Sequence, residues 1–141
     1  MEFKLQVIST LNQLGVDNKY KGYLYVFSSL CFISENEQNF LPITKILYSE
    51  IAKQFNTSAV CIEKDIRKVI EYVWDNKNGN DVIIEIFGDN NNKPTNKKFL
   101  ISLYKYILTL NIQQYIICPL SKKKCKYCQD LIEKVLYLTR V

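Results

Sequence analysis

Three cysteines near the end of the chain have the residue type and spacing of metal ligands. Cys125 and Cys128 form a Cys-x2-Cys pair, and Cys118 lies seven positions before it. Thiolates at this spacing suit tetrahedral zinc, and the neighbouring lysines favour the thiolate form. A closed zinc site needs a fourth ligand, which Cys31, Cys61 or a second subunit would have to supply. The sequence predicts that these cysteines are reduced thiols, with no metal and no cofactor. A zinc site and a redox-active or disulfide pair are the alternatives.

Residue types that the chain lacks exclude most enzyme chemistry. There is no histidine, so Ser-His and Cys-His catalytic pairs and histidine-ligated metals are all excluded. The glycines number 4 and are isolated from one another, so the sequence has no glycine-rich phosphate loop. We therefore predict that the protein is not an enzyme.

Positive charge gathers in the C-terminal third of the sequence. Residues 1–92 carry 9 basic and 12 acidic side chains, whereas residues 93–141 carry 10 basic and 2 acidic ones. A basic segment favours a polyanionic partner such as nucleic acid, although a lysine-rich solvated surface would have the same composition. No apolar run is long enough to span a membrane and no signal peptide is recognisable, so we expect a cytoplasmic protein that does not bind membranes.

Helices are the elements that must position these side chains. Glycine and proline are scarce and apolar residues recur at helical spacing, which predicts an all-α, compact bundle of six to seven helices. The expected helices cover residues 2–14, 21–34, 42–55, 58–75, 81–87, 94–110 and 126–139. Residues 1–110 are predicted to form one domain, and residues 111–141 a basic, cysteine-containing helical extension. The apolar side of this extension would pack on its own domain or on a second copy.

Individual side chains define the expected ends and faces of these helices. Gly15 is placed to end the first helix, and Asp81 to cap the fifth. The second helix has on one side Leu24, Phe27, Ser28, Cys31 and Phe32. The third, with Pro42 in its first turn, has an inner face of Ile43, Ile46, Leu47, Ile51 and Phe55. The fourth is expected to bury Ile62, Ile66, Val69, Ile70, Val73 and Trp74.

The third and fourth predicted helices have the spacing of a helix-turn-helix. Three good N-cap residues separate them, namely Asn56, Thr57 and Ser58. The small Ala52 allows close approach, and Ile62 would clamp the second helix onto the first. The outward face then carries Val60, Lys64, Arg67, Lys68 and Glu71, with Glu63 at its flank. The basic members suit phosphates and guanine edges in a major groove, whereas an ordinary helical hairpin would present the same charged face.

Several blocks of sequence resemble one family in order and spacing. They are residues 21–25 (Lys-Gly-Tyr-Leu-Tyr), 43–48, 51–57, 66–67, 70–71, Trp74 and 93–96 (Lys-Pro-Thr-Asn). This part of the chain, roughly residues 5–108, resembles the C-terminal effector domain of the stage zero sporulation protein A family. The resemblance implies six helices, with the third and fourth as the helix-turn-helix. It also implies binding to short DNA boxes, often as tandem dimers, that activates or represses sporulation-phase transcription.

The chain departs from the family pattern in ways that bear on DNA recognition. The family's receiver domain is absent, so control by aspartyl phosphorylation within this chain is not expected. Val60 and Cys61 replace a Ser-Arg pair early in the recognition helix, and neither can make the bidentate arginine–guanine contact. Lys64 and Lys68 replace an Arg and a His, whereas Glu63 and Arg67 match. Residues 109–141 extend beyond the family pattern.

We therefore predict a DNA-binding transcriptional regulator of the sporulation response-regulator effector type, with double-stranded DNA as its partner. The predicted DNA-binding residues are Ser58, Val60, Cys61, Glu63, Lys64, Arg67, Lys68, Lys93, Thr95 and Asn96. The alternative is a protein-interaction module with weakened DNA reading, which modulates a full-length paralogous regulator or the transcription machinery. A homodimer, or a heterodimer with such a paralogue, is compatible with either function.

Overall fold

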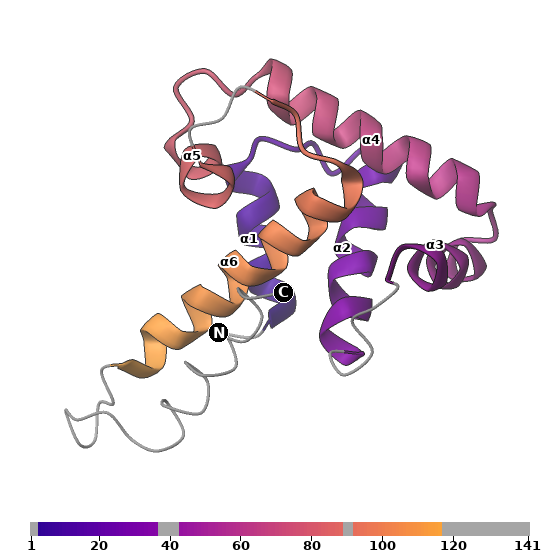
Figure 1. Cartoon of the computed structure of the whole chain (residues 1–141), viewed down its shortest axis with the longest axis horizontal. Coiled ribbons are helices and arrows are strands. Elements are labelled where there is room, and N and C mark those ends of the chain that lie inside the picture. Colours follow the sequence, from indigo (N-terminus) through magenta and orange to yellow (C-terminus); the bar gives the residue numbers. More distant parts are fainter. Residues whose placement is uncertain (1–2, 37–42, 89–91, 117–141) are drawn as a thin grey trace.

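Six helices make up most of residues 3–36, 43–88 and 92–116, which are the residues that the computed structural model describes (Figure 1). They are α1 (Phe3–Gln13), α2 (Lys21–Glu35), α3 (Ile43–Gln54), α4 (Ala59–Asp75), α5 (Asp81–Phe87) and α6 (Asn96–Ile116). None of the described residues lies in a strand, and the all-α fold class is confirmed. The first residues of the predicted extension 111–141, residues 111–116, continue α6. The rest of that extension and the predicted seventh helix, residues 126–139, lie outside the described residues.

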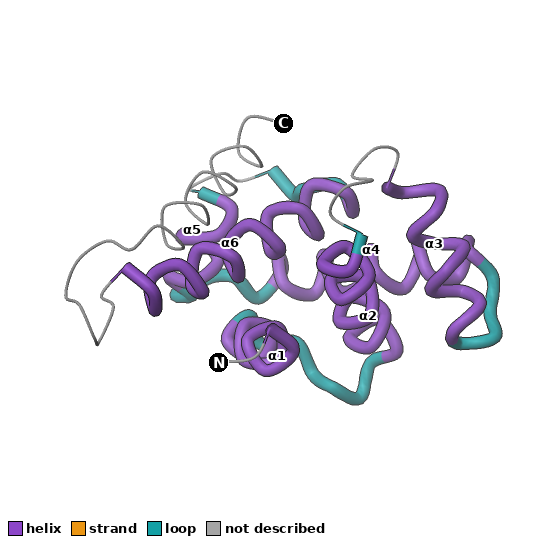
Figure 2. The backbone as a smooth tube through the Cα atoms, turned by 90° about the horizontal axis from the view of Figure 1, so that it is seen from below, coloured by secondary structure: helices purple, strands orange, loops and turns teal. Residues whose placement is uncertain are grey.

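The hydrophobic core surrounds α2, which contacts α1, α3, α4 and α6. Figures 1 and 2 show α1 and α6 on one side of α2 and α3 on the other. Each of these helices contributes side chains without solvent exposure, among them Val7, Leu11, Val26, Leu30, Leu47, Ile51, Ile62, Ile66, Phe99 and Leu103. Full burial of such a side chain stabilises the fold by about 1.5–3 kcal/mol. Four neighbours therefore hold α2 in place, and α2 in turn supports α4.

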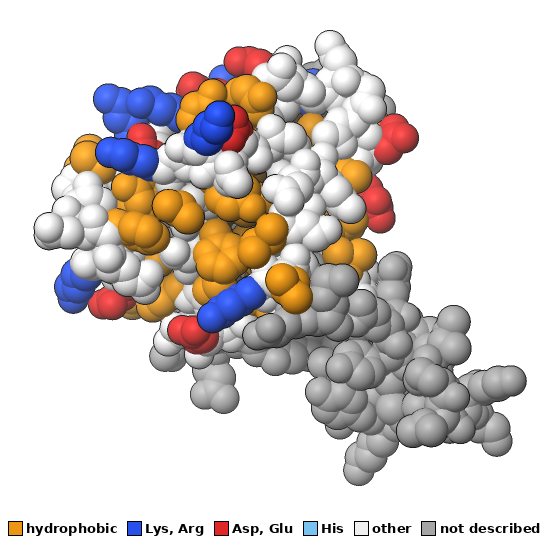
Figure 3. Space-filling model, turned by 180° about the vertical axis from the view of Figure 1, so that it is seen from behind, with side chains coloured by type: hydrophobic (Ala, Val, Ile, Leu, Met, Phe, Trp, Pro, Cys, Tyr) orange, Lys and Arg blue, Asp and Glu red, His pale blue; other side chains and the backbone are white. Residues whose placement is uncertain are grey.

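The most deeply buried face of α2 is not the one that the sequence pattern grouped together, although Phe27 and Phe32 of that group pack partly buried against the core. Leu24 is 47% exposed, whereas Val26, Leu30 and Ile33 are buried. α2 carries apolar residues on nearly all of its sides, so its neighbours rather than its periodicity decide which side is buried. Figure 3, which views the molecule from behind, shows several apolar side chains gathered on that surface.

A short turn joins α3 and α4 at the position predicted for the helix-turn-helix. Asn56 adopts a left-handed conformation with φ of 53°, which an asparagine tolerates better than most residues. The N–H of Thr57 donates to the Ala52 carbonyl at 2.9 Å and closes α3. Phe55 then packs edge-on against Tyr25, with ring centroids 5.0 Å apart. These contacts anchor the turn to α2 and fix the point from which α4 starts.

Other helix ends and faces follow the sequence, with two corrections. Gly15 has a positive φ of 80° just after α1, as expected of a helix-ending glycine. The cap of α5 is Asn80 and not Asp81, because the Val82 N–H donates to Asn80 Oδ1 at 3.1 Å. On α3, Leu47 and Ile51 are buried as predicted. Ile46, however, is 50% exposed, so the stripe of α3 that packs against α2 and α4 is narrower than the predicted one.

Gly22 allows α2 and α4 to pack unusually close together. It is buried in the first turn of α2, facing α4. A Cβ atom at this position would lie 2.4 Å from Val69 Cγ2 and 2.5 Å from the Asp65 carbonyl oxygen. Real Cβ atoms do not approach other heavy atoms so closely. The distance between the two helices therefore depends on the absence of a side chain at residue 22.

Candidate nucleic-acid interface

α4 presents the face to solvent that its sequence pattern predicts. All of the residues expected to face inward are buried, namely Ile62, Ile66, Val69, Ile70, Val73 and Trp74. The residues expected to face outward are exposed, namely Val60, Lys64, Arg67, Lys68 and Glu71. Glu63 is half-buried at the flank, also as expected. The rotation of α4 about its axis is therefore fixed by six buried side chains, which turn Val60, Lys64, Arg67, Lys68 and Glu71 outward.

The N-terminus of α4 is capped by a side chain from the turn. Ser58 has an extended backbone, and its Oγ accepts a hydrogen bond from the Cys61 N–H at 3.2 Å. Such a cap stabilises a helix by about 1 kcal/mol because it pairs one of the free amides of the first turn. Ser58, Val60 and Cys61 are all exposed. The predicted site residues of this turn thus lie at the surface, with Ser58 shaping the end of the helix.

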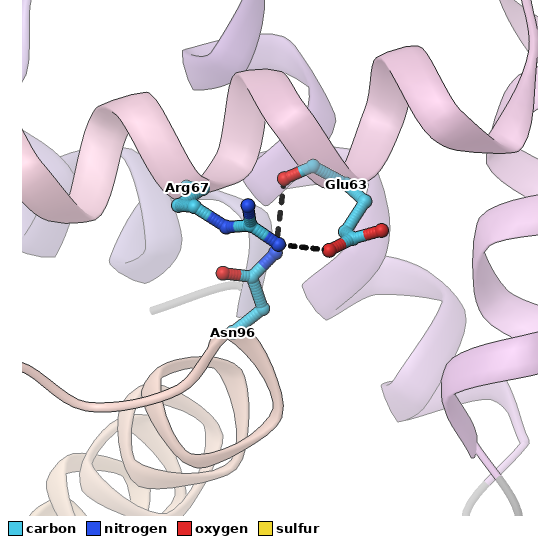
Figure 4. Close-up of polar contacts among 3 residues, drawn as sticks. All are labelled: Glu63, Arg67 and Asn96. Carbon is cyan, nitrogen blue, oxygen red and sulfur yellow. Dashed lines mark hydrogen bonds and ion pairs between the residues drawn. The ribbon is translucent and has the colours of Figure 1, made fainter.

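Asn96 ties the start of α6 to the middle of the recognition face (Figure 4). Its Nδ2 donates to the backbone carbonyl of Glu63 at 3.0 Å, across 33 positions of sequence. Burial raises the pKa of Tyr48 on α3, whose hydroxyl shares a side-chain hydrogen bond with Asn96. One amide therefore links α3, α4 and α6. This link sets the position of α6 relative to the outer face of α4.

Glu63 also holds Arg67 through an ion pair one helical turn away (Figure 4). Both side chains of the pair are in contact with solvent, with 58% exposure for Arg67 and 42% for Glu63. An exposed pair of this spacing is worth only about 0.3–0.5 kcal/mol. A phosphate or a base edge can therefore replace Glu63 as the partner of Arg67 at little cost.

A groove of about 450 Å³ runs between α4 and the start of α6. Basic side chains line it from both helices and from the preceding loop, namely Arg67, Lys93 and Lys97. Thr95 begins α6, with its Oγ1 accepting a hydrogen bond from the Lys98 N–H at 3.2 Å. Lys93 and Thr95 are exposed, and Asn96 is half-buried. The structure thus brings these three predicted residues next to Glu63 and Arg67, although they are distant in sequence.

On the opposite side of α4 lies a larger groove, of about 600 Å³, that the sequence reasoning missed. Its basic lining residues are Lys19, just before α2, Lys21 at the start of α2, and Lys68 of α4, and its acidic ones are Asp65, Glu71 and Asp75 of α4. The rings of Tyr20 and Tyr72 meet across it with centroids 5.9 Å apart. In the sequence, the available signal for this groove was the Lys-Tyr-Lys run at residues 19–21. Only the fold places this run beside α4, which is distant in sequence. Lysines therefore flank the recognition face on both sides.

Charge changes sign along the outer face of α4. The exposed basic residues Lys64, Arg67 and Lys68 occupy its middle, and the exposed acidic residues Glu71 and Asp75 follow towards its C-terminal end. The first turn contains no acidic residue and the last turn no basic residue. A polyanion is therefore attracted to the N-terminal part of this face and repelled from its C-terminal part.

The cysteines of the described residues form no metal site. Cys31 is partly exposed, Cys61 is exposed, and both are free thiols. No group of three or more potential metal ligands is present in residues 3–36, 43–88 and 92–116. The zinc hypothesis concerns Cys118, Cys125 and Cys128, which lie outside these ranges, and it stays a prediction. Within the same ranges, no helix has the length and apolar character needed to cross a bilayer.

Cys61 is expected to react with iodoacetamide faster and at lower pH than Cys31. Hydrogen bonds from the Ser58 and Thr57 side chains lower the pKa of the exposed Cys61 thiol, whereas burial raises the pKa of Cys31. A lower pKa leaves more of the reactive thiolate at any given pH. Peptide mass spectrometry across a pH series measures both rates in one sample. Equal rates at every pH, or a faster Cys31, would contradict this assignment.

A comparison with known families identifies the fold that carries this interface. The family model described as "Sporulation initiation factor Spo0A C terminal" matches residues 7–107, from within α1 to within α6. The match includes the helix-turn-helix, both lysine-lined grooves and the Asn96 link. It confirms the resemblance that the sequence blocks indicated. The chain therefore belongs to the Spo0A C-terminal family, whose members are DNA-binding effector domains of sporulation response regulators.

Proposed function

We propose that this chain regulates transcription by inserting the N-terminal half of α4 into the major groove of double-stranded DNA. The observation that carries the proposal is the exposed basic stretch of Lys64, Arg67 and Lys68 on a helix whose rotation is fixed by its buried face. A helix in this groove contacts base edges with its N-terminal side chains. The backbone of the duplex then runs along each flank of the helix.

The flanks of α4 suit the two phosphate backbones of a major groove. Lys93 and Lys97 lie on the α6 side, and Lys19 and Lys21 on the α2 side. Contacts to phosphates set the register of a protein on DNA without reading sequence, while contacts to bases specify. We assign the flanking lysines to the first role and the outer face of α4 to the second. Asn96 positions the α6 flank through its bond to the Glu63 carbonyl.

Selection on random duplex, followed by fluorescence anisotropy, tests this proposal. We expect one sequence to be enriched and bound about a thousandfold more tightly than random duplex at physiological salt. Bound DNA is also expected to protect Cys61 from alkylation, since Cys61 lies at the end of α4 that enters the groove. Lys4 is exposed in the first turn of α1, and Figure 1 shows the N-terminal end of the chain away from α4. The Lys4→Ala variant therefore serves as the control that loses a positive charge without losing affinity. Equal affinity for selected and random duplex would contradict sequence-specific binding.

One observation favours the alternative of a protein-interaction module. Val60 and Cys61 provide no side chain that can make a bidentate contact to guanine at the start of α4. A module of this kind would bind a paralogous regulator or the transcription machinery in preference to DNA. Affinity capture from cell extract, with and without nuclease, separates the two functions. A protein partner that survives nuclease treatment supports the alternative, and loss of all partners on treatment supports DNA binding.

A further inference from the structure

Val60 is an exposed aliphatic side chain in the first turn of the recognition helix. Its 72% exposure is the highest among the large hydrophobic side chains of the described residues. It shares the outer face of α4 with Lys64, one turn further along, and with Lys68 beyond. Val60 is therefore an exposed apolar side chain at the tip of a face whose next exposed members are charged.

Rotation of α4 about its axis cannot remove the Val60 side chain from solvent. Ile62 and Ile66 are fully buried on the opposite side of α4, and their burial fixes the helix about its axis. Ser58 caps the same turn, so the backbone at Val60 is held as well. The branched side chain of valine has few rotamers. A rigid apolar group therefore projects from the end of α4 that would lie deepest in a major groove.

Base pairs offer one apolar group in the major groove, which is the C5-methyl of thymine. The other groups displayed there are hydrogen-bond donors and acceptors. Valine can neither donate nor accept a hydrogen bond through its side chain, so it cannot read those groups. An isopropyl group against a methyl group instead removes apolar surface of both from water.

We propose that Val60 reads the C5-methyl of thymine and thereby determines part of the DNA sequence that this protein selects. This inference rests on the proposed function, because it requires α4 to lie in the major groove. It assigns to the first turn of α4 a preference for A·T pairs with thymine on the strand nearest Val60. Arg67 and the lysines of the middle turns act on neighbouring positions.

Replacing thymines by 2′-deoxyuridine in the selected site tests the proposal with the smallest change available. Deoxyuridine lacks the methyl group and keeps the base pair and its polar groups. With the full chain, we expect affinity to fall about fourfold at one or two adjacent positions, as for the loss of one buried methyl group. The Val60→Ala variant should bind the unmodified site about fourfold more weakly and show no further loss with deoxyuridine.

Control variants separate a methyl contact from a general loss of binding. Val60→Ile retains a branched apolar side chain and is expected to remain sensitive to deoxyuridine. Ile84→Ala removes an apolar side chain that is 51% exposed on α5, and should leave DNA affinity unchanged. The proposal is overturned if no thymine responds with the unaltered protein, or if Val60→Ala remains sensitive at the same position. If random selection enriches no site at all, the proposed function fails first, and this inference fails with it.

Discussion

The Gly22→Ala variant is expected to lose about 3 kcal/mol of unfolding free energy, at the upper end of what overpacking usually costs. The added Cβ would meet Val69 Cγ2 at 2.4 Å and the Asp65 carbonyl oxygen at 2.5 Å. The valine side chain can move, but the carbonyl belongs to the backbone of α4 and cannot move alone. The helices must separate, which opens the core on both sides of α2. Urea denaturation followed by circular dichroism measures the change.

Two further variants show whether the close approach is responsible. Lys21→Ala changes the adjacent, exposed position in the same turn and should alter stability by less than about 0.5 kcal/mol. The Gly22→Ala, Val69→Ala double variant removes the side-chain clash and leaves the one with the Asp65 carbonyl. We expect it to recover little of the lost stability. If the single Gly22→Ala variant is as stable as the unaltered protein, α2 and α4 can accommodate the added Cβ and the prediction is wrong.

Arg67→Ala is expected to weaken binding to the selected DNA site by about 1–3 kcal/mol and to relax specificity at one base pair. Arg67 is exposed in the middle of the recognition face, and its exposed ion pair with Glu63 is easily exchanged for a base edge. Arginine can donate two parallel hydrogen bonds to guanine, which lysine cannot. Arg67→Lys should therefore keep the salt dependence of binding and still lose discrimination. Anisotropy titrations against the selected site and its single-base variants measure both effects.

A role for Arg67 at a phosphate would give a different pattern. Binding would then weaken uniformly across DNA sequences, and the slope of log K against log salt would fall by about one. That outcome would contradict base reading by this residue. Glu63→Gln supplies an independent check, because removing the carboxylate frees Arg67. We expect this variant to bind random duplex more tightly than the unaltered protein does.

The recognition helix could be predicted in detail from the sequence because its two faces differ so strongly in polarity. Six apolar positions at helical spacing alternate with charged ones, and all six are buried in α4. The sequence limited the cap of α4 to three adjacent residues, Asn56, Thr57 and Ser58, and the structure selects Ser58. Where local pattern and local cap agree in this way, the surrounding structure has little left to decide.

Faces that depend on several neighbours could not be predicted in the same way. α2 is apolar on both the side with Leu24 and the side with Val26, so only its packing partners show that the second is buried. Ile46 fits the helical pattern as well as Leu47 does, yet it is half exposed. The choice between Asn80 and Asp81 as the cap of α5 depends on backbone angles that two adjacent capping residues do not reveal.

The flanks of the site are a tertiary feature for a further reason. The acceptor that Asn96 uses is a backbone carbonyl, that of Glu63, and any residue would display the same group. No pattern of side chains in the sequence can therefore predict the hydrogen bond that links α6 to α4. Lys19 and Lys21 come next to Lys68 only because α2 approaches α4 at Gly22. In the sequence, Lys93, Thr95 and Asn96 are indicated as DNA-binding residues only by the blocks shared with the family.

The arrangement of charge on α4 favours DNA binding at the expense of the stability of the helix. Acidic residues in a first turn and basic residues in a last turn each stabilise a helix by about 0.3–1 kcal/mol, and α4 has neither. An acidic residue near Val60 would stabilise the helix and would also repel a phosphate backbone. A lysine in place of Asp75 would steady it too, while extending attraction for any polyanion beyond the part that reads sequence. Heat-resistant variants that gain stability at the ends of α4 should therefore bind DNA more weakly or less selectively.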